Sequence, residues 1–334
     1  MKMKKTMLIS ILAIFTLILT ACGGGGSESG EGGSQTLKLA HSGSESHQYH
    51  IAAEKFKELV EEKTNGEITI EIHPNATLGS EADAIEQVMG GTIEMTTVSA
   101  DSSFANTIPE ANVFGIPYLF EDRDHVYSVL DGEIGQEILD LAGENNMKGL
   151  GYWEVGFRHL TNNQREINTP EDAQGLKIRV QPAPVWEAHM RAIGASPTPV
   201  DFNELYSALD QGVVDGQENP LPTIDSMKFY EVQNHVSLTA HTYSPAVVVM
   251  NAEVWEGLSE EQQTAIDEAT AEAAEYQRQF LADREEEILQ VLADNDVTVT
   301  EPDRAAFREA TADVQEAVSE QVPADLVERI QAAN

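Results

Sequence analysis

The sequence is poor in cysteine and in basic residues. Cys22 is the only cysteine among 334 residues, so no disulfide can form within the chain. Only 20 lysines and arginines stand against 57 aspartates and glutamates, which gives a formal net charge of −37 at pH 7. Because so few basic residues cannot assemble a basic patch, the composition argues against nucleic acid as a partner. We interpret the acidic excess as a solvated surface suited to saline or alkaline surroundings.

No run of apolar residues near the start is long enough to span a membrane. The run from Met7 to Leu19 falls short of the roughly 20 residues that a spanning helix needs. Three lysines precede it, and Leu-Thr-Ala follows directly before Cys22. This order predicts a signal peptide over residues 1–21 and a lipid anchor on Cys22, placing the protein outside the cytoplasm on the cell membrane.

Residues 22–36 lack the apolar side chains that a folded segment would bury. Glycine, serine and glutamate make up all of residues 23–34. This composition predicts a flexible tether between the membrane and the folded part. Cleavage after residue 21 removes three lysines and no acids, so the mature net charge becomes −37 − 3 = −40.

The motifs of common catalytic sites are also missing. The sequence has no G-x-S-x-G turn, no H-E-x-x-H helix and no phosphate-binding loop, since its glycine run lacks the flanking strand, helix and lysine. No carboxylate pair of the glycosidase kind stands out. His47 and His50 are three residues apart, but without a third ligand we interpret them as polar residues at a helix start and predict no metal or cofactor.

What is present is an alternation of strand-like and helix-like segments, which predicts an α/β fold. The predicted strands are 36–41, 67–73, 95–99, 149–153, 176–181, 232–238 and 246–250. The predicted helices are 50–63, 81–89, 122–130, 184–193 and 203–209, with a capped turn at 169–172. A capping box at Ser259 and the absence of proline and glycine until Pro302 predict one long helix from Glu260 toward Leu292.

The stretch from Gly175 to Pro220 contains two candidate ligand-binding residues, Arg179 and Asn219. Leu176, Ile178 and Val180 alternate with Lys177 and Arg179, so the apolar trio faces a core and Arg179 leaves by the other face. A guanidinium fixed at a strand end matches a carboxylate with two parallel hydrogen bonds. Asn219 is predicted to lie in a turn, and its side-chain amide can both donate and accept hydrogen bonds. The pattern favours a site for an organic acid.

The sequence of this stretch resembles those of the solute receptors of tripartite ATP-independent periplasmic (TRAP) transporters, the DctP-type family. The resemblance extends over nearly all of the chain from Leu37. It rests on PNATLGSE, VFGIPYLF, GFRHLTNN, TPEDAQGLKIRV, GASPTPVDFNELYSAL and VVDGQENP, which occur in the order typical of the family. It implies a receptor, not an enzyme, that binds an organic acid anion and delivers it to the small and large membrane subunits of a TRAP permease driven by an ion gradient.

The resemblance implies a fold of the periplasmic-binding-protein (Venus flytrap) kind, in which two α/β lobes close on the solute and a long helix spans both. Residues 37–155 and 245–284 would form lobe I, and residues 156–244 and 285–334 lobe II. The chain would cross between the lobes near Val155 and Ser244.

The resemblance also implies site residues. Arg179 matches the arginine that pairs with the ligand carboxylate, Arg158 a second arginine, and Asn219 a ligand-binding amide. Glu81 matches an acidic position that reaches polar groups of the ligand, although a carboxylate in the first turn also favours its own helix. Four further candidates are Phe202 and Trp153 as walls of the cleft, for which ordinary packing is the alternative, and Ser99 and His41 at strand ends.

The ligand and the partner leave alternatives open. A hydroxylated acid such as a hexuronate or aldonate is favoured, and a C4-dicarboxylate comes next. A lipoprotein hydrolase acting on acidic sugars, a binding protein of another transporter or sensor, and a structural lipoprotein without a ligand are the other functions considered.

Overall fold

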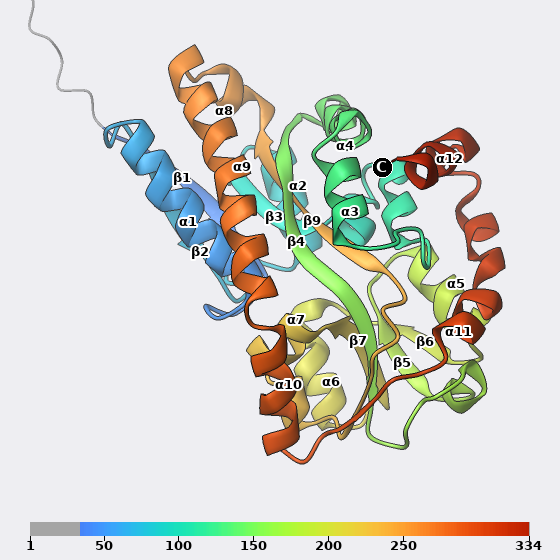
Figure 1. Ribbon diagram of the computed structural model, residues 1–334. Helices are drawn as coiled ribbons and strands as arrows, with labels where there is room; N and C mark the ends of the chain where they lie inside the picture. The colour runs from blue at the N-terminus through green and yellow to red at the C-terminus, as the bar shows by residue number, and fades with distance from the viewer. Residues whose placement is uncertain (1–33, 334) are drawn as a thin grey trace, which may run out of the picture. The chain divides into compact units, whose positions relative to one another are not determined.

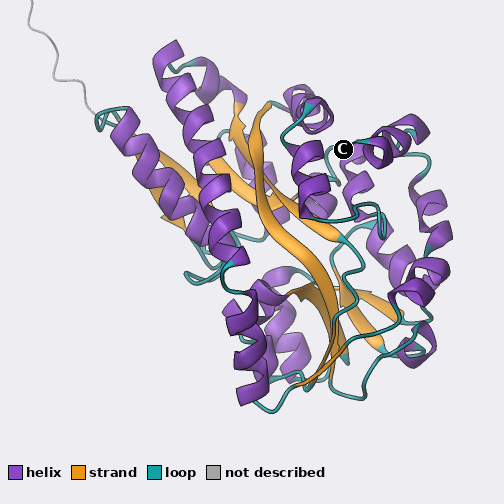
Figure 2. Ribbon diagram, viewed as in Figure 1, coloured by secondary structure: helices purple, strands orange, loops and turns teal. Residues whose placement is uncertain are grey.

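A computed structural model describes residues 34–333, whose centre is a sheet of ten strands (Figures 1 and 2). The predicted signal peptide, the lipid-anchored Cys22 and most of the predicted tether lie outside these residues. The strands are β1 (Gln35–Ala40), β2 (Ile68–His73), β3 (Met95–Ser99), β4 (Met147–Asn162), β5 (Lys177–Val180), β6 (Ser196–Pro199), β7 (Gly216–Pro220), β8 (His235–Ser237), β9 (Tyr243–Asn251) and β10 (Thr298–Thr300).

The strand order is β2-β1-β3-β9-β4-β7-β5-β6, with β8 pairing with both β4 and β10. The pairs β1–β2, β1–β3, β5–β6 and β5–β7 are parallel, whereas β9 runs antiparallel to both β3 and β4. Parallel pairs next to connecting helices are typical of α/β folds. The mixed sheet therefore agrees with the predicted fold class.

The longest strand, β4, connects the two halves of the sheet. Its first part pairs with β9 as far as Phe157, opposite Tyr243. From Arg158 onward it pairs with β7, and near its end also with β8. The register is irregular between Glu154 and Gly156, so the face to which each side chain points changes there. This is the region where the chain is predicted to cross between lobes.

Twelve α-helices cover the sheet within the described residues (Figure 2). They are α1 (Gln48–Lys63), α2 (Glu81–Met89), α3 (Arg123–Leu130), α4 (Glu133–Asp140), α5 (Pro184–Ala192), α6 (Leu205–Asp210), α7 (Leu221–Ser226), α8 (Ala252–Glu256), α9 (Glu260–Ala282), α10 (Glu285–Asp294), α11 (Arg304–Ala310) and α12 (Ala324–Ala332). Helices α1 and α9 lie side by side against β4 (Figure 1).

The buried apolar side chains form three clusters. One fills the space between α1, α9 and β1, and includes Phe56 and Trp153. Another joins α6, α7, β8 and α10 around Phe229. The largest lies around α3, α4 and α5, with Phe114 and Trp186 fully buried. Burial of such side chains supplies most of the stabilisation of the fold.

Two local predictions are wrong. The helix expected from Glu260 toward Leu292 is interrupted, since α9 ends at Ala282 and α10 begins at Glu285. Asn219, expected in a turn, lies in β7, where its backbone pairs with β4. The strand predicted at 149–153 is present but extends over the sixteen residues of β4. Helix α2 and strand β3 have the predicted bounds.

None of the helices within residues 34–333 has both the length and the apolar character needed to cross a bilayer.

Candidate functional site

A small cavity lies where the middle of β4, the end of β7 and the starts of α1 and α2 meet. About 20 Å³ of it is open to the centre of a water-sized molecule, which is room for about one water. Its lining residues are His47, Tyr49, Glu81, Ser99, Val155, Arg158, Gln181, Phe202 and Asn219. Larger hollows exist, but this one gathers buried charged groups with shifted pKa values, which is typical of functional sites.

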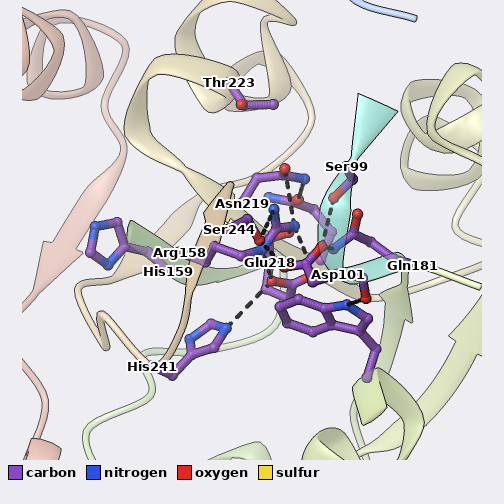
Figure 3. Close-up of polar contacts among 12 residues, drawn as sticks. Ser99, Asp101, Arg158, His159, Gln181, Glu218, Asn219, Thr223, His241 and Ser244 are labelled. Carbon is purple, nitrogen blue, oxygen red and sulfur yellow. Dashed lines mark hydrogen bonds and ion pairs between the residues drawn. The ribbon is translucent and has the colours of Figure 1, made fainter. Parts of the chain in front are cut away.

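Arg158 and Glu218 form a buried ion pair beside the cavity (Figure 3). Arg158 donates to the Glu218 carboxylate through Nε and Nη2, the latter at 2.9 Å, and Nη2 also donates to Asn219 Oδ1 at 3.1 Å. Burial alone would raise the pKa of Glu218, but Arg158 and His241 outweigh it and hold the pKa below its usual value. The pair is fixed by strand pairing, because β4 carries the arginine and β7 the carboxylate.

Arg179, on β5, is buried without such a partner. Its Nε donates to the carbonyl of Val200 at 2.8 Å, but Nη1 has no hydrogen-bond partner among the described residues. No ion pair within 4.0 Å joins Arg179 to any carboxylate in the described part of the chain. Burial is the main cause that lowers its pKa to about 10, which leaves it charged at neutral pH. A buried charge without a counter-ion is costly, so this site favours an anion.

Two further carboxyl groups lie at or near the cavity, that of Glu81, which is half-buried in its wall, and that of Asp101, which is fully buried beside Arg158. Glu81 accepts from Ser42 Oγ at 2.7 Å, from the Ser99 N–H at 3.0 Å and from Ser103 Oγ at 3.1 Å. Burial raises its pKa in spite of these hydrogen bonds. Such a carboxyl group can accept a hydrogen bond from a hydroxyl group.

Asp101 lies in a π-helical turn, Ala100–Phe104, which directly follows β3. Its carboxyl group accepts from Ser99 Oγ at 2.6 Å and from Gln181 Nε2 at 3.3 Å, and Ser244 donates to its other oxygen. Burial is the largest influence on this group and raises its pKa. Figure 3 shows Asp101, Glu218 and Ser244 gathered around Arg158.

Neutral rings complete the wall. His47 packs edge-on against Tyr49 and Phe202, with ring centroids 4.6 and 5.7 Å away. Burial holds the pKa of His47 well below its usual value, so the ring is neutral at neutral pH. Gln48 Nε2 donates to Thr223 Oγ1 at 2.7 Å and to the carbonyl of Val155 at 3.1 Å, which connects α1, α7 and β4 around the cavity.

The structure brings together most of the residues singled out in the sequence. Arg158, Asn219, Glu81, Phe202 and Ser99 line the one cavity. Arg179 is not among the lining residues, although its charge interacts with those of Glu81 and Glu218. Arg158, expected as a second ligand-binding arginine, lines the cavity, and Glu218 accepts hydrogen bonds from its Nε and Nη2.

Trp153 and His41 do not line the cavity. Trp153 packs against Phe56 and donates to the carbonyl of Thr270 at 3.2 Å, so it belongs to an apolar core. This position agrees with ordinary packing, which was the alternative considered for Trp153. His41 Nε2 lies 3.1 Å from His50 Nδ1, and burial, followed by the effect of His50, lowers the pKa of His41 to about 3.

Several residues of the site were not predicted from the sequence. Glu218 stands next to Asn219 in GQENP, and Gln181 follows the strand that carries Arg179. Asp101 and Tyr49 lie just outside the elements predicted from the sequence, the strand 95–99 and the helix 50–63. Within residues 34–333, no three His, Cys, Asp or Glu side chains gather as metal ligands would, and His47 instead approaches Thr223.

Comparison with known proteins places this geometry in a family. The model of "bacterial extracellular solute-binding protein, family 7" (DctP) matches residues 39–321. The 2,3-diketo-L-gulonate-binding periplasmic protein YiaO of Escherichia coli is 38% identical over 300 residues, covering 89% of this chain and 91% of that protein. The C4-dicarboxylate-binding periplasmic protein DctP of Rhodobacter capsulatus is 33% identical, covering 84% and 85%.

A solved structure is also similar. The TRAP periplasmic solute-binding protein of Polaromonas sp. JS666, bound to D-erythronate, superposes with a TM-score of 0.87 at 36% identity. The superposition covers 90% of this chain and 99% of that one.

Proposed function

This chain belongs to bacterial extracellular solute-binding protein family 7, the DctP-type receptors of TRAP transporters, and we propose that its solute is a hydroxylated monocarboxylic acid such as a hexuronate or an aldonate. Family membership confirms three predictions, namely the resemblance itself, the two-lobed periplasmic-binding-protein fold and a receptor in place of an enzyme. The protein is therefore a receptor for organic acids that acts outside the cytoplasm.

The buried, unpaired guanidinium of Arg179 is the observation that carries the proposal. Its free Nη1 and its distance from any carboxylate leave a positive charge that a ligand carboxylate would neutralise with charge-assisted hydrogen bonds. The chain is strongly acidic, so an anion is repelled over most of the surface and needs such a local positive focus.

The polar groups that line the cavity support the hydroxylated class. Glu81 and the Asn219 amide supply hydrogen-bond acceptors, and Glu81 is half-buried at the cavity wall. A second ligand carboxylate placed there would meet a like-charged group, whereas a hydroxyl group would donate to it. The relatives named above bind sugar acids in two cases and C4-dicarboxylates in the third, so a C4-dicarboxylate is the second candidate.

The experiment is a thermal-shift panel on the purified protein, with hexuronates, aldonates, succinate and malate. A ligand at a hundred times its Kd adds about 2.7 kcal/mol to the free energy of unfolding. We expect a hexuronate or an aldonate to give the largest shift, and Arg179→Ala to abolish it. The matched control is Arg191→Ala, which removes the same charge at an exposed site paired with Glu187.

Two results would contradict the proposal. Larger shifts with succinate or malate would replace the hydroxylated class by C4-dicarboxylates. Equal shifts in Arg179→Ala and Arg191→Ala would remove Arg179 from the site.

Delivery and anchoring are further parts of the proposal. The partners are the small and the large membrane subunits of a TRAP permease, energised by an ion gradient, and uptake into vesicles that hold a gradient but no ATP tests this. Cys22 carries the lipid anchor and residues 22–34 form the tether, which is two residues shorter than predicted because Gln35 and Thr36 belong to β1. Incorporation of a fatty-acid analogue into the wild type but not into Cys22→Ser is the expected result, and an unlabelled wild type would refute the anchor.

A further inference from the structure

Two adjoining hollows lie on the side of β4 that faces away from the solute cavity. Their volumes are about 180 Å³ and about 420 Å³, and both are lined by Arg123, Phe157, Ala240 and Arg304. Arg158 lines the solute cavity, whereas its neighbours Phe157 and His159 line the hollows. Figure 3 shows the His159 ring directed away from the group around Arg158. We call the joined hollows the arginine bay, defined by Tyr118, Phe120, Arg123, Phe157, Arg304 and Arg308.

The wall of the bay is aromatic and fixed in place. Phe120 and Phe157 both pack edge-on against the buried Tyr243, with centroids 6.1 and 5.2 Å away. Tyr118 donates through its hydroxyl to the carbonyl of Thr239 at 3.3 Å, and its backbone N–H donates to His241. A rigid aromatic wall offers apolar surface to a ligand without a large cost in ordering.

Arg304 and Arg308 stand one turn apart on α11, and neither pairs with an acid. Within the described part of the chain no carboxylate lies within 4.0 Å of either guanidinium, although the sequence has 57 acids and six other arginines there are paired. Each is held by one carbonyl, Leu238 at 3.1 Å for Arg304 and Tyr118 at 3.4 Å for Arg308. Most of their donors therefore face the bay and solvent.

Arg308 also lies over the Tyr118 ring, at 4.9 Å from its centroid. This contact orients the guanidinium beside an apolar surface, where its charge acts more strongly than in open water. The two groups thus present a positive charge at the edge of an aromatic wall.

Acidic residues nearby limit which anions can bind. Asp122 already caps α3 by accepting from the His125 N–H at 2.9 Å, and Glu154 accepts from Tyr127 and pairs with Arg123. Glu121 and Asp124 are exposed at the rim and repel anions. A small inorganic anion gains too little from charge alone, whereas an anion with an aromatic body also buries apolar surface.

We propose that the arginine bay is a second binding site, separate from the solute cavity, for a small anion with an aromatic or apolar body, such as an aryl sulfonate or aryl carboxylate. The acidic group would contact Arg304 and Arg308, and the aromatic body would pack on Tyr118, Phe120 and Phe157.

The test uses 1-anilinonaphthalene-8-sulfonate, whose fluorescence rises when it leaves water. We expect saturable binding of one dye per protein and an affinity lowered about tenfold in Arg304→Ala/Arg308→Ala, because both contacts to the sulfonate are lost. The matched control, Arg191→Ala/Lys38→Ala, removes the same two charges at exposed positions elsewhere. Thermal melts establish that both variants are folded, and the single variant Arg308→Glu should weaken binding as well.

The outcomes separate this site from the solute cavity. Equal dye affinity in the bay variant and its control overturns the proposal, as does the absence of saturable binding. Loss of dye binding in Arg179→Ala, or displacement of the dye by the hexuronate or aldonate that shifts the melting temperature, would place the dye in the solute cavity and also overturn it. A failed solute panel with intact dye binding would leave the bay standing.

Discussion

The two buried arginines of the site differ in what neutralises them. Arg158 is paired with Glu218, and this pairing raises its pKa although burial acts in the opposite direction. Arg179 has no such partner, and burial lowers its pKa to about 10. Both lie in equally marked motifs, so the sequence predicts two ligand-binding arginines. The difference arises from the pairing of β4 and β7, which brings Glu218 to Arg158 from sixty positions away.

His159 gives the clearest dependence of stability on pH. Burial, followed by the nearby His241 and Arg304, lowers its pKa to about 3 from an unfolded value of 6.5. Between these values the unfolded chain binds more protons than the folded one, so stability is present above pH 6.5 and is lost as the pH falls toward 3. One such group costs about 1.4 kcal/mol per pH unit over most of this range.

We therefore expect His159→Gln to lose less stability than the wild type between pH 7 and pH 5, by about 2 kcal/mol. Urea unfolding at the two pH values measures this difference. His41 also has a pKa of about 3, and the raised pKa values of Glu81 and Asp101 act with the opposite sign, but these groups are the same in both proteins and cancel. Parallel losses of stability in the two proteins would contradict the assignment.

At the level of elements, Gly216 on β7 leaves no room for a side chain beside β4. A Cβ atom added there would lie 2.0 Å from the carbonyl oxygen of Thr161 and 2.8 Å from Asn162 Cβ, so the strands would have to separate. Overpacking of this kind costs about 1–3 kcal/mol. Because Asn219 follows three residues later on the same strand, we expect Gly216→Ala to lower both the free energy of unfolding and the affinity for the solute.

Urea unfolding, with the midpoint and the m-value both determined, measures the free energy of unfolding. Solute titration measures the affinity. The matched control is Gly143→Ala, since nothing lies within 4 Å of a Cβ atom added there. It should change little or stabilise by up to about 1 kcal/mol. Similar midpoints for the two variants would show that the close approach of the strands has no energetic weight.

The elements that sequence reasoning missed are those decided by distant packing. Capping boxes at Ser80 and Ser259 precede α2 and α9, and the starts of both helices were predicted, the second from its capping box. The break between α9 and α10 has no glycine or proline. It occurs where the helix leaves one core, holding Ile266, and enters another, holding Ile288. Such a change of packing partner is not encoded in the periodicity of either segment.

For the molecule as a whole, five of the nine residues that line the candidate cavity were singled out in the sequence, but the charge balance of the cavity was not predicted. The cavity unites segments that lie up to about 170 positions apart, from His47 at the start of α1 to Asn219 on β7. Composition indicated only that the surface is acidic. The local positive focus at Arg179 depends on which acids the fold leaves out of reach, and that is a property of the tertiary structure.

The net charge of the whole chain gives a prediction about salt. With −37 at pH 7, we expect repulsion among carboxylates to oppose the folded state more than surface ion pairs, such as Arg278 with Asp131, support it. The Debye length falls from about 30 Å at 0.01 M to about 10 Å at 0.1 M, so screening changes most over this range. We expect the melting temperature to rise with NaCl mainly below 0.1 M, by about 2–4 °C for each kcal/mol gained.

Scanning calorimetry between 0.01 and 0.3 M NaCl, with KCl as the control, measures the melting temperature. The two salts should act equally. A melting temperature that falls or stays constant would mean that ion pairs outweigh the repulsion.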